Sequence, residues 1–423
     1  MITIPFNVIE RDVKLPINRK KIIMVPGVRR CGKSTLMEIA INNLIREGVP
    51  SKNILWLGFD DERLKNMSSE ELDNVITSYM EMFPDIPIKD VHMFFDEIQL
   101  IKDWEYFVLR VYKSYCKNIY VCGSNATMLS TELSSALRGY PLEYETHPLS
   151  FNEYCRFKGI VTDSYLEQDR ARLKVTFEAY NQASAFPEIV LTSSKSEQLK
   201  LLHSYFDTMI LKDLSEHYKI SNTGVVRYFV KRIIANLTKP TSINAIYKDI
   251  KSQGLKVSKD DLYLWADYIC NIFMFIRISK YDRSLIKKQK SPDKYYCTDN
   301  GMRGAVLMPQ SNDNGKNLEN TVFMQLNRMR LPTDKITYYQ GNCECDFVLQ
   351  REDSVLQLIQ VTWDMADENT REREVKGWLE AASVTGCENL IIITKDAEDI
   401  FVRDGKEIRI IPAWKWLLQN NEK

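Results

Sequence analysis

The chain has 423 residues, of which 44% are hydrophobic and 27% are charged, and its 57 basic residues balance its 57 acidic ones. This length exceeds what a single hydrophobic core usually supports, so two or three domains are expected. The balanced charge excludes a protein whose overall field attracts nucleic acid or an acidic lipid surface, so any polyanion site must be local.

The apolar runs and the cysteines predict the cellular compartment. No apolar run reaches the roughly 20 residues that a membrane-spanning helix needs, and the opening segment "MITIPFNVIERDV" lacks the pattern of a signal peptide. The nine cysteines contain no CxxC pair, and an odd number in a chain of this size favours reduced thiols. The sequence therefore predicts a cytoplasmic protein with no membrane segment.

The first motif lies between a predicted strand and a predicted helix. The apolar run "KKIIMV" is typical of a buried parallel strand, and "STLMEIAINNLIRE" carries apolar residues at helical spacing from Leu36 to Ile45. Between them, "GVRRCGKST" matches G-x-x-x-x-G-K-[ST] in the strand-loop-helix context that a phosphate-binding loop requires.

Each part of this loop has a physical reason to bind a nucleotide. Gly27 and Gly32 permit backbone angles that turn successive amides toward one anion, and the helix start adds its positive dipole end. Lys33 would reach the β and γ phosphates, and the Ser34 hydroxyl would bind magnesium. The predicted nucleotide-binding residues are Gly27, Val28, Arg29, Arg30, Cys31, Gly32, Lys33, Ser34 and Thr35.

Acidic and polar side chains follow the next apolar strands. In "VHMFFDEIQ", Asp96 ends a strand as the predicted metal-side acid, and Glu97 is the candidate general base. The strand in "NIYVCGSN" ends at Ser124 and Asn125, which are predicted to orient the attacking water. Alternating strands and helices from Lys20 to about Ser150 predict a doubly wound parallel sheet that binds its ligand at the strands' carboxyl ends.

Four segments together resemble a family of bacterial and archaeal AAA+ ATPases: "GVRRCGKSTL", "FFDEIQ", "GSN" and "LRGYPLEYETHPLSFNEY". The resemblance implies binding and hydrolysis of ATP with Mg²⁺, a Walker A motif at Gly27 to Thr35, a Walker B motif at Asp96 and Glu97, and a sensor at Asn125. It also implies a homo-oligomer in which an arginine from a neighbouring subunit completes the site. Where the family pattern ends "LRGR", this chain reads "LRGY", so Arg138 is either that arginine or a surface residue.

The middle of the chain predicts a helical region and then a winged helix-turn-helix. From Asn152 to about Ser221 the pattern is helical, as in the lid and connector of an ATPase. Two amphipathic helices in "SINAIYKDIKSQG" and "SKDDLYLWADYICNIFMF" precede a strand-rich ribbon, "IRISKYDRSLIKKQKSPDKYYCTDNG". This ribbon carries the basic residues Arg277, Lys280, Arg283, Lys287, Lys288, Lys290 and Lys294.

Three interpretations of this basic ribbon remain open. Basic residues interleaved with tyrosines suit contact with the phosphate backbone of DNA. A solvated hairpin whose lysines protect its edge strand has the same composition. A winged helix also serves as a module that binds other proteins.

The last part of the chain has the element order of a PD-(D/E)XK nuclease, the domain that the resemblance also implies there. A helix carrying Glu319 precedes the strands "KITYYQ", "CECDFVLQ" and "VLQLIQVTW", with Asp346 in the second. Such a core holds magnesium with acids and uses a lysine two residues past the last ligand. Here that motif reads Gln360, Val361, Thr362, and Lys376 on the next helix is the candidate replacement for the missing lysine. An active nuclease and a nuclease-like fold kept for docking or DNA binding both fit this pattern.

The predicted fold class is α/β. A P-loop NTPase sheet of the AAA+ type is followed by an α-helical and winged-helix region and by a restriction-endonuclease-like domain. The expected boundaries are 1–155 for the ATPase domain, 156–225 for the lid or connector, 226–305 for the winged helix and 306–423 for the nuclease-like domain. The leading functional hypothesis is an ATPase that acts on DNA, and the alternatives are an ATP-regulated nuclease and a nucleotide-gated scaffold for another protein.

Overall fold

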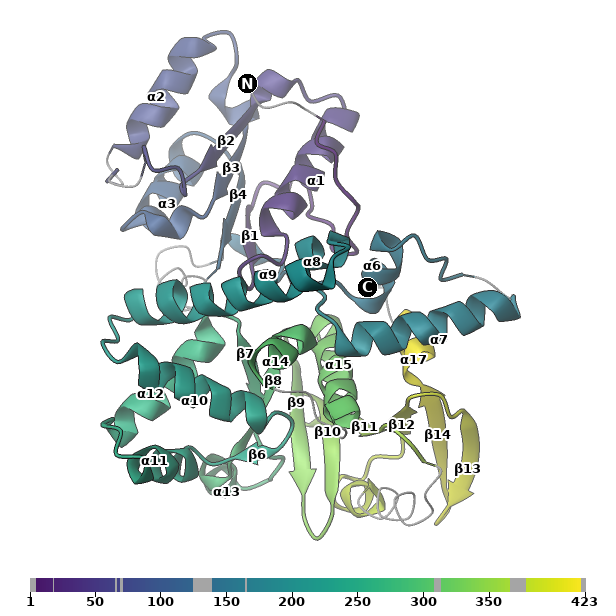
Figure 1. Cartoon of the computed structure of the whole chain (residues 1–423). Coiled ribbons are helices and arrows are strands. Elements are labelled where there is room, and N and C mark those ends of the chain that lie inside the picture. Colours follow the sequence, from purple (N-terminus) through teal and green to yellow (C-terminus); the bar gives the residue numbers. More distant parts are fainter. Residues whose placement is uncertain are drawn as a thin grey trace. The chain divides into compact units, whose positions relative to one another are not determined.

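The computed structural model describes residues 5–17, 19–64, 67–68, 71–124, 139–163, 166–307, 313–365 and 378–419. The chain forms two compact units. The N-terminal unit comprises Met1–Pro148 with Asn271–Phe273, and the C-terminal unit comprises Leu149–Cys270 with Met274–Lys423. In Figure 1, purple and blue mark most of the first unit, and teal to yellow mark the second.

The N-terminal unit is built on a five-stranded, wholly parallel sheet with the order β2-β3-β4-β1-β5. Parallel strands buried on both faces need unbroken apolar sequences, which "IIMVP" and "HMFFD" supply. The strands are β1 (Ile22–Pro26), β2 (Ile54–Gly58), β3 (His92–Asp96), β4 (Asn118–Gly123) and β5 (Pro141–Glu143). This arrangement confirms the predicted α/β fold with a parallel sheet.

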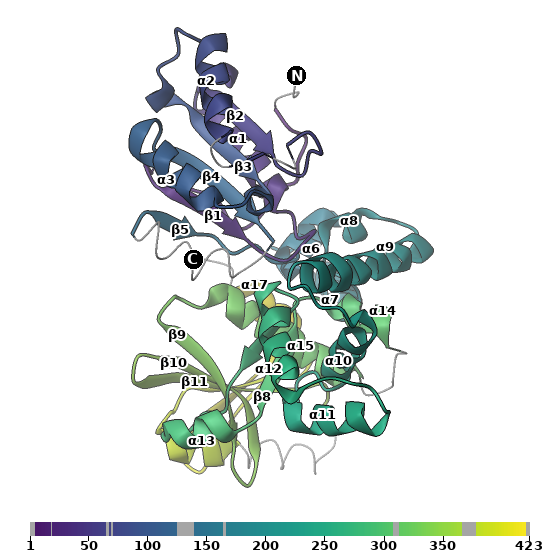
Figure 2. The same cartoon turned by 90° about the vertical axis from the view of Figure 1, so that its left-hand side faces the viewer.

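Helices cover both faces of this sheet (Figures 1 and 2). Alternate side chains of each strand point to opposite faces. Thus Val25 packs in the cluster that includes α1 (Lys33–Arg46), whereas Met24 packs in the cluster that includes α2 (Leu72–Met82) and α3 (Trp104–Ser114). Short 3₁₀ turns at η1 (Ser51–Asn53), η2 (Ile88–Asp90) and η3 (Ile98–Leu100) complete the connections.

The C-terminal unit begins with helices, as the sequence pattern predicts. The Ser150 side chain accepts a hydrogen bond from the Glu153 backbone and starts the first helix, and Pro187 starts the third. The helices are α6 (Phe151–Phe157), α7 (Glu167–Gln182), α8 (Pro187–Leu191), α9 (Lys195–Thr208), the π-helical η4 (Met209–Glu216) and α10 (Thr223–Ala235).

A small three-stranded sheet with the order β6-β8-β7 follows. The predicted ribbon is partly wrong, because "LIKKQK" forms a short helix, α13, between β7 and β8. Ser284 caps that helix by accepting a hydrogen bond from the Lys287 backbone. The elements are β6 (Pro240–Thr241), α11 (Ile243–Ser252), α12 (Lys259–Asn271), β7 (Phe275–Ile278), α13 (Leu285–Lys290), β8 (Asp293–Cys297) and α14 (Asn300–Val306).

A six-stranded mixed sheet with the order β13-β14-β12-β11-β10-β9 forms the core of the rest. Phe347 and Ile359 face the cluster that contains α15, and Val348 and Leu358 face the cluster that contains the helix over residues 378–385. The elements are α15 (Asp313–Met329), β9 (Asp334–Gln340), β10 (Glu344–Arg351), β11 (Ser354–Thr362), β12 (Leu390–Thr394), β13 (Asp399–Arg403), β14 (Lys406–Pro412) and α17 (Ala413–Gln419).

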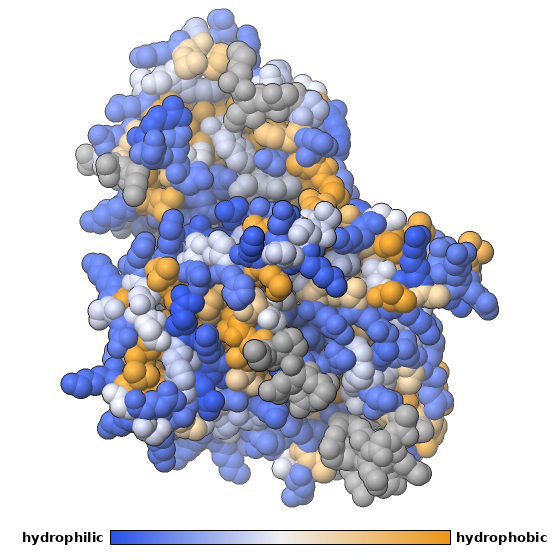
Figure 3. Space-filling view, viewed as in Figure 1, coloured by the Kyte–Doolittle hydropathy of each residue, from blue (hydrophilic) through white to orange (hydrophobic). Residues whose placement is uncertain are grey.

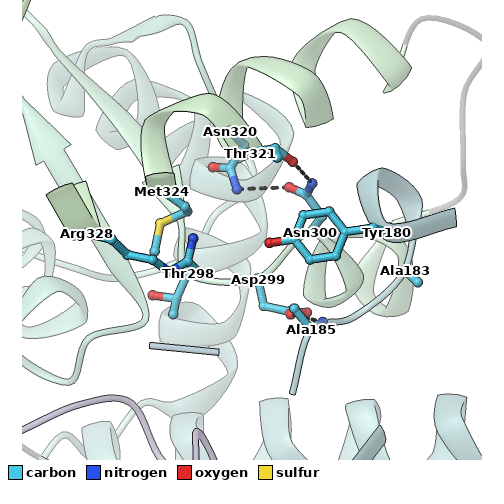
Figure 4. A pocket seen from close by; sticks show the side chains of 10 residues that line it. All are labelled: Tyr180, Ala183, Ala185, Thr298, Asp299, Asn300, Asn320, Thr321, Met324 and Arg328. Carbon is cyan, nitrogen blue, oxygen red and sulfur yellow. Dashed lines mark hydrogen bonds between the residues drawn. The ribbon is translucent and has the colours of Figure 1, made fainter. Parts of the chain in front are cut away.

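A buried polar layer joins α14, α15 and β8, and Figure 4 shows Asn300 facing Asn320 and Thr321 around a cavity. Asn320 pairs with both the N–H and the C=O of Cys297, at 2.8 Å each, and donates to Asn300 at 2.9 Å. The cavity measures about 20 Å³, which is room for about one water molecule. These polar groups are buried at little cost because they satisfy one another.

The exposed face in Figure 3 is mainly hydrophilic, with hydrophobic residues in separate patches. Among the residues that the structure describes, no helix combines the length and the apolar character needed to cross a bilayer.

His92, at the start of β3, is a buried titratable group of the N-terminal unit. The imidazole is 4% exposed, and its Nδ1 has no hydrogen-bond partner among the described residues. Burial lowers the pKa of His92 below its usual value. As the pH falls through about 6.5, the unfolded chain gains a proton that the folded chain resists, so stability is lost.

We therefore predict that thermal unfolding monitored from about pH 7.5 to about pH 5.5 shows a smaller decline for His92→Phe than for the wild type. Parallel declines would show that His92 does not contribute to the acid sensitivity.

Candidate nucleotide-binding site

The glycine loop occupies the connection between β1 and α1, from Gly27 to Gly32. Gly27 has no space for a side chain, because a Cβ atom there would lie 2.2 Å from the backbone oxygen of Thr146. Gly32 has a φ of 96°, a left-handed conformation that glycine adopts without strain. Lys33, Ser34 and Thr35 form the first turn of α1, so the loop leads directly into a helix N-terminus.

Contacts beneath the loop hold its backbone. The Cys31 thiol donates to the Thr146 oxygen at 3.2 Å, and the Thr146 N–H donates to the Pro26 oxygen at 2.7 Å. The buried Arg11 donates to the Cys31 oxygen at 2.9 Å and to the His147 oxygen at 2.8 Å. Sequence reasoning missed Arg11, because a lone arginine in a segment without a motif gives no signal of its partners.

Lys33 and Glu97 lie together at the carboxyl edge of the sheet. The Lys33 ammonium is 4% exposed, lies 3.8 Å from the Glu97 carboxylate and donates to the Val28 oxygen at 3.2 Å. Burial lowers the pKa of Lys33, but the nearby ionisable groups Cys31, Glu97, Cys122 and Asp96 outweigh burial and raise it. Burial also raises the pKa of the Cys31 thiol, so at neutral pH the carboxylates are the charged partners. The ammonium therefore stays charged at neutral pH.

Asp96 lies beside Ser34. Its carboxylate is buried and accepts hydrogen bonds from the Ser34 hydroxyl and the Cys122 thiol. Burial raises the pKa of Asp96, and these two hydrogen bonds only partly offset that effect. A hydroxyl and a carboxylate, both oxygen donors, thus meet at the first turn of α1, and such a pair suits Mg²⁺.

Glu97 has a left-handed backbone, with φ 51° and ψ 37°, which is rare for a residue with a long side chain. Gln99 donates a hydrogen bond to its carboxylate and also lies 3.5 Å from the Ser124 hydroxyl. Gly123 leaves room for this glutamine, since a Cβ atom there would lie 2.6 Å from Gln99 Oε1. Sequence reasoning missed Gln99, although the motif "DEIQ" contains it. Two of the predicted residues, Asn125 and Arg138, lie outside the described residues.

A second cluster lies in the C-terminal unit. The structure brings together Glu319 on α15, Asp346 on β10 and Gln360 on β11, while Lys376 lies outside the described residues. The ammonium of Lys294, from β8, donates to Glu319 at 3.2 Å and to Asp346 at 3.4 Å.

The basic residues of the predicted ribbon differ in their exposure and in their partners. Lys294 is 1% exposed, and its charge is used inside the protein. Arg277 pairs with Asp267 at 2.7 Å, and Arg283 donates to the Val384 oxygen at 3.1 Å. Lys280 pairs with Tyr338 through its backbone, Lys287 and Lys290 on α13 are exposed, and Lys288 is half-buried.

Residues 19–155 match the family described as the AAA domain, and residues 175–313 match a domain of unknown function, DUF8612. The first match agrees with the parallel sheet and the glycine loop, which give the N-terminal unit a P-loop NTPase fold. The whole chain is 30% identical over 421 residues to an uncharacterized protein of Methanocaldococcus jannaschii, covering 97% of this chain and 91% of that protein. The chain therefore belongs to the same family as that archaeal protein.

Other similarities are more distant. An uncharacterized protein of Haemophilus influenzae is 26% identical over 397 residues, which are 94% of each chain. Among solved structures, Aeropyrum pernix ORC1 in complex with DNA is 12% identical with a TM-score of 0.31, covering 68% of this chain and 86% of that one. AMPPCP-bound DnaA from Aquifex aeolicus is 12% identical with a TM-score of 0.28, covering 58% and 81%.

The space around Gly27 generates a prediction. In Gly27→Ala the new methyl group would collide with the Thr146 backbone, so the loop must shift and its amides no longer converge on one phosphate. We expect ATP affinity, measured by titration of a fluorescent analogue, to fall by about tenfold or more. Gly304→Ala is the matched control, because nothing lies within 4 Å of its added Cβ. Equal affinity of Gly27→Ala and wild type would contradict the close approach seen here.

Proposed function

We propose that this protein binds ATP with Mg²⁺ and hydrolyses it in the N-terminal unit. One observation carries the proposal: the glycine loop, the Lys33 ammonium and the carboxylates of Asp96 and Glu97 converge at the same edge of one parallel sheet. Ligands of open parallel sheets bind at this edge, and a buried ammonium beside a helix N-terminus attracts a polyphosphate.

The roles of the residues follow from their positions. The loop amides and the start of α1 would hold the phosphates, and Lys33 would exchange its contacts with Val28 and Glu97 for the terminal phosphates. Ser34 and Asp96 would hold Mg²⁺, whose charge would neutralise phosphate oxygens. Glu97, oriented by Gln99, would accept the proton of the attacking water.

We also propose roles for Asn125 and Arg138, the two predicted residues of this site that lie outside the described part of the chain. Asn125 comes two residues after the end of β4 in the sequence and would orient the water, and Arg138 would contact the nucleotide of a neighbouring subunit in a homo-oligomer. Both assignments rest on the resemblance to AAA+ ATPases.

Glu97→Gln tests the catalytic assignment. The amide keeps the shape of the side chain but cannot accept the proton, so we expect ATP turnover to fall by about 100-fold or more while ATP still binds. Phosphate release and nucleotide affinity are measured on the same preparation, with Glu81→Gln on the surface of α2 as the control. Turnover equal to that of the wild type would remove Glu97 from the mechanism.

For the rest of the chain we propose a winged-helix region over 226–305, after a helical connector over 156–225. The pair α11 and α12 beside the sheet β6-β8-β7 supports this proposal. The ATPase domain would span 1–155 and a nuclease-like core 306–423, whose α15, hairpin and parallel strands have the expected order. We propose that ATP hydrolysis moves these parts on DNA, with the lysines of α13 as phosphate contacts.

The triple variant Lys287→Ala/Lys288→Ala/Lys290→Ala separates DNA binding from binding of a protein partner. If these lysines contact phosphates, DNA affinity falls and the slope of log K against log salt becomes shallower by up to about three units. The control removes three exposed lysines elsewhere in the same unit, Lys195, Lys200 and Lys335. Identical affinities for the two triple variants would favour the alternative of a nucleotide-gated scaffold whose partner is a protein.

A further inference from the structure

Lys294 lies at the centre of the acidic cluster that the sequence assigns to metal binding. Its ammonium donates to the carboxylates of Glu344 at 2.5 Å, Glu319 at 3.2 Å and Asp346 at 3.4 Å. The same ammonium lies 5.4 Å from the centre of the Tyr338 ring, an additional favourable contact for a cation. An ammonium has three N–H donors, and each has a carboxylate here.

The electrostatics agree with this geometry. Burial opposes the charge on Lys294, but Glu319, Asp346 and Glu344 raise the pKa of the lysine far above its ordinary value. Burial raises the pKa of Asp346 well above its usual range, as do the charges of Glu319 and Glu344, while Lys294 lowers it. The acids thus repel one another and require a cation, and the ammonium supplies one.

The other donors of the cluster are also engaged. The Gln360 side-chain oxygen accepts from the Asp346 N–H at 3.1 Å, and the second Asp346 oxygen accepts from the Val361 N–H at 2.9 Å. Tyr296, two residues after Lys294 on β8, donates to Glu319 at 2.8 Å. A divalent ion would have to displace the ammonium and take ligands that backbone amides and a phenol already use. The residues present therefore do not fit the metal that a PD-(D/E)XK core implies.

We propose that Lys294 is the permanent cation of this site, so that the nuclease-like core binds no divalent ion there and serves as a rigid joint. Lys294 and Tyr296 project from β8, whereas their partners lie on α15 and β10. The ion cluster therefore links the three-stranded sheet to the six-stranded one. Removing one partner leaves buried charge uncompensated, which costs more than removing the whole cluster.

Lys294→Met tests the joint, because methionine keeps the length of the side chain without its charge. We expect the unfolding temperature of the full chain to fall by on the order of 10 °C, since the carboxylates lose their counter-ion. About 1 mM Mn²⁺ should recover part of that loss by entering the emptied site. The variant Lys294→Met/Glu319→Gln/Asp346→Asn removes the ammonium and the two most buried carboxylates and keeps only Glu344, which is 39% exposed. We therefore expect it to recover stability without Mn²⁺ and to show no such response.

The wild type and Asp346→Asn give a test that does not depend on how Lys294→Met folds. We expect the two proteins to bind the same number of Mn²⁺ ions, measured by electron paramagnetic resonance without nucleotide, because the nucleotide loop is identical in both. We also expect neither to cleave DNA in Mn²⁺.

Two results would overturn the proposal. The first is a Mn²⁺ ion or a DNA cleavage activity that is present in the wild type and lost in Asp346→Asn, since Lys294 would then belong to an active nuclease site. The second is a Mn²⁺ response of Lys294→Met no larger than that of the triple variant, since the acids would then not form a cation site.

Discussion

The parallel pairing of β1, β4 and β3 is the constraint on which the N-terminal unit depends. Each strand is apolar on both faces, so helices must cover both sides of the sheet. Because the strands are parallel, each connection must also carry the chain back to the edge of the sheet where the strands start. The glycine loop after β1 and the acids after β3 are separated by about sixty residues in sequence and by one strand in the sheet. Parallel register brings the ends of β1 and β3 to the same edge, where Lys33 and Glu97 lie 3.8 Å apart.

The buried lysines Lys33 and Lys294 differ in how many contacts their ammonium groups make within the protein. Lys33 has a carboxylate at 3.8 Å and a backbone oxygen at 3.2 Å, both of which a phosphate can replace. Lys294 has a carboxylate for each of its donors and an aromatic ring beside it. In the proposed function the ammonium of Lys33 exchanges these contacts for a phosphate. The ammonium of Lys294, in contrast, already has a carboxylate for each N–H.

The helices and strands of both units follow from local sequence patterns that can be recognised without the structure. Apolar strands, the Ser150 capping box and the amphipathic pattern of α15 each act over a few residues, so they were predictable. The ribbon was mispredicted because β-branched and aromatic residues flank "SLIKKQK", where a serine cap is enough to start one helical turn. The match of the N-terminal residues to the AAA domain agrees with the glycine loop and the acid pair recognised in the sequence.

The sequence by itself determined the parallel α/β class and the glycine loop, because both depend on residue types at short, regular spacing. The sequence also grouped Glu319, Asp346 and Gln360 as the candidate metal ligands of a nuclease-like core. The tertiary structure alone decided their partner: nothing in the spacing of a lysine 25 residues before Glu319 indicates that its ammonium lies among these acids. Likewise Arg11 and Gln99 are recognised only by what they touch. Contacts between distant segments depend on how layers pack, and local patterns do not encode that packing residue by residue.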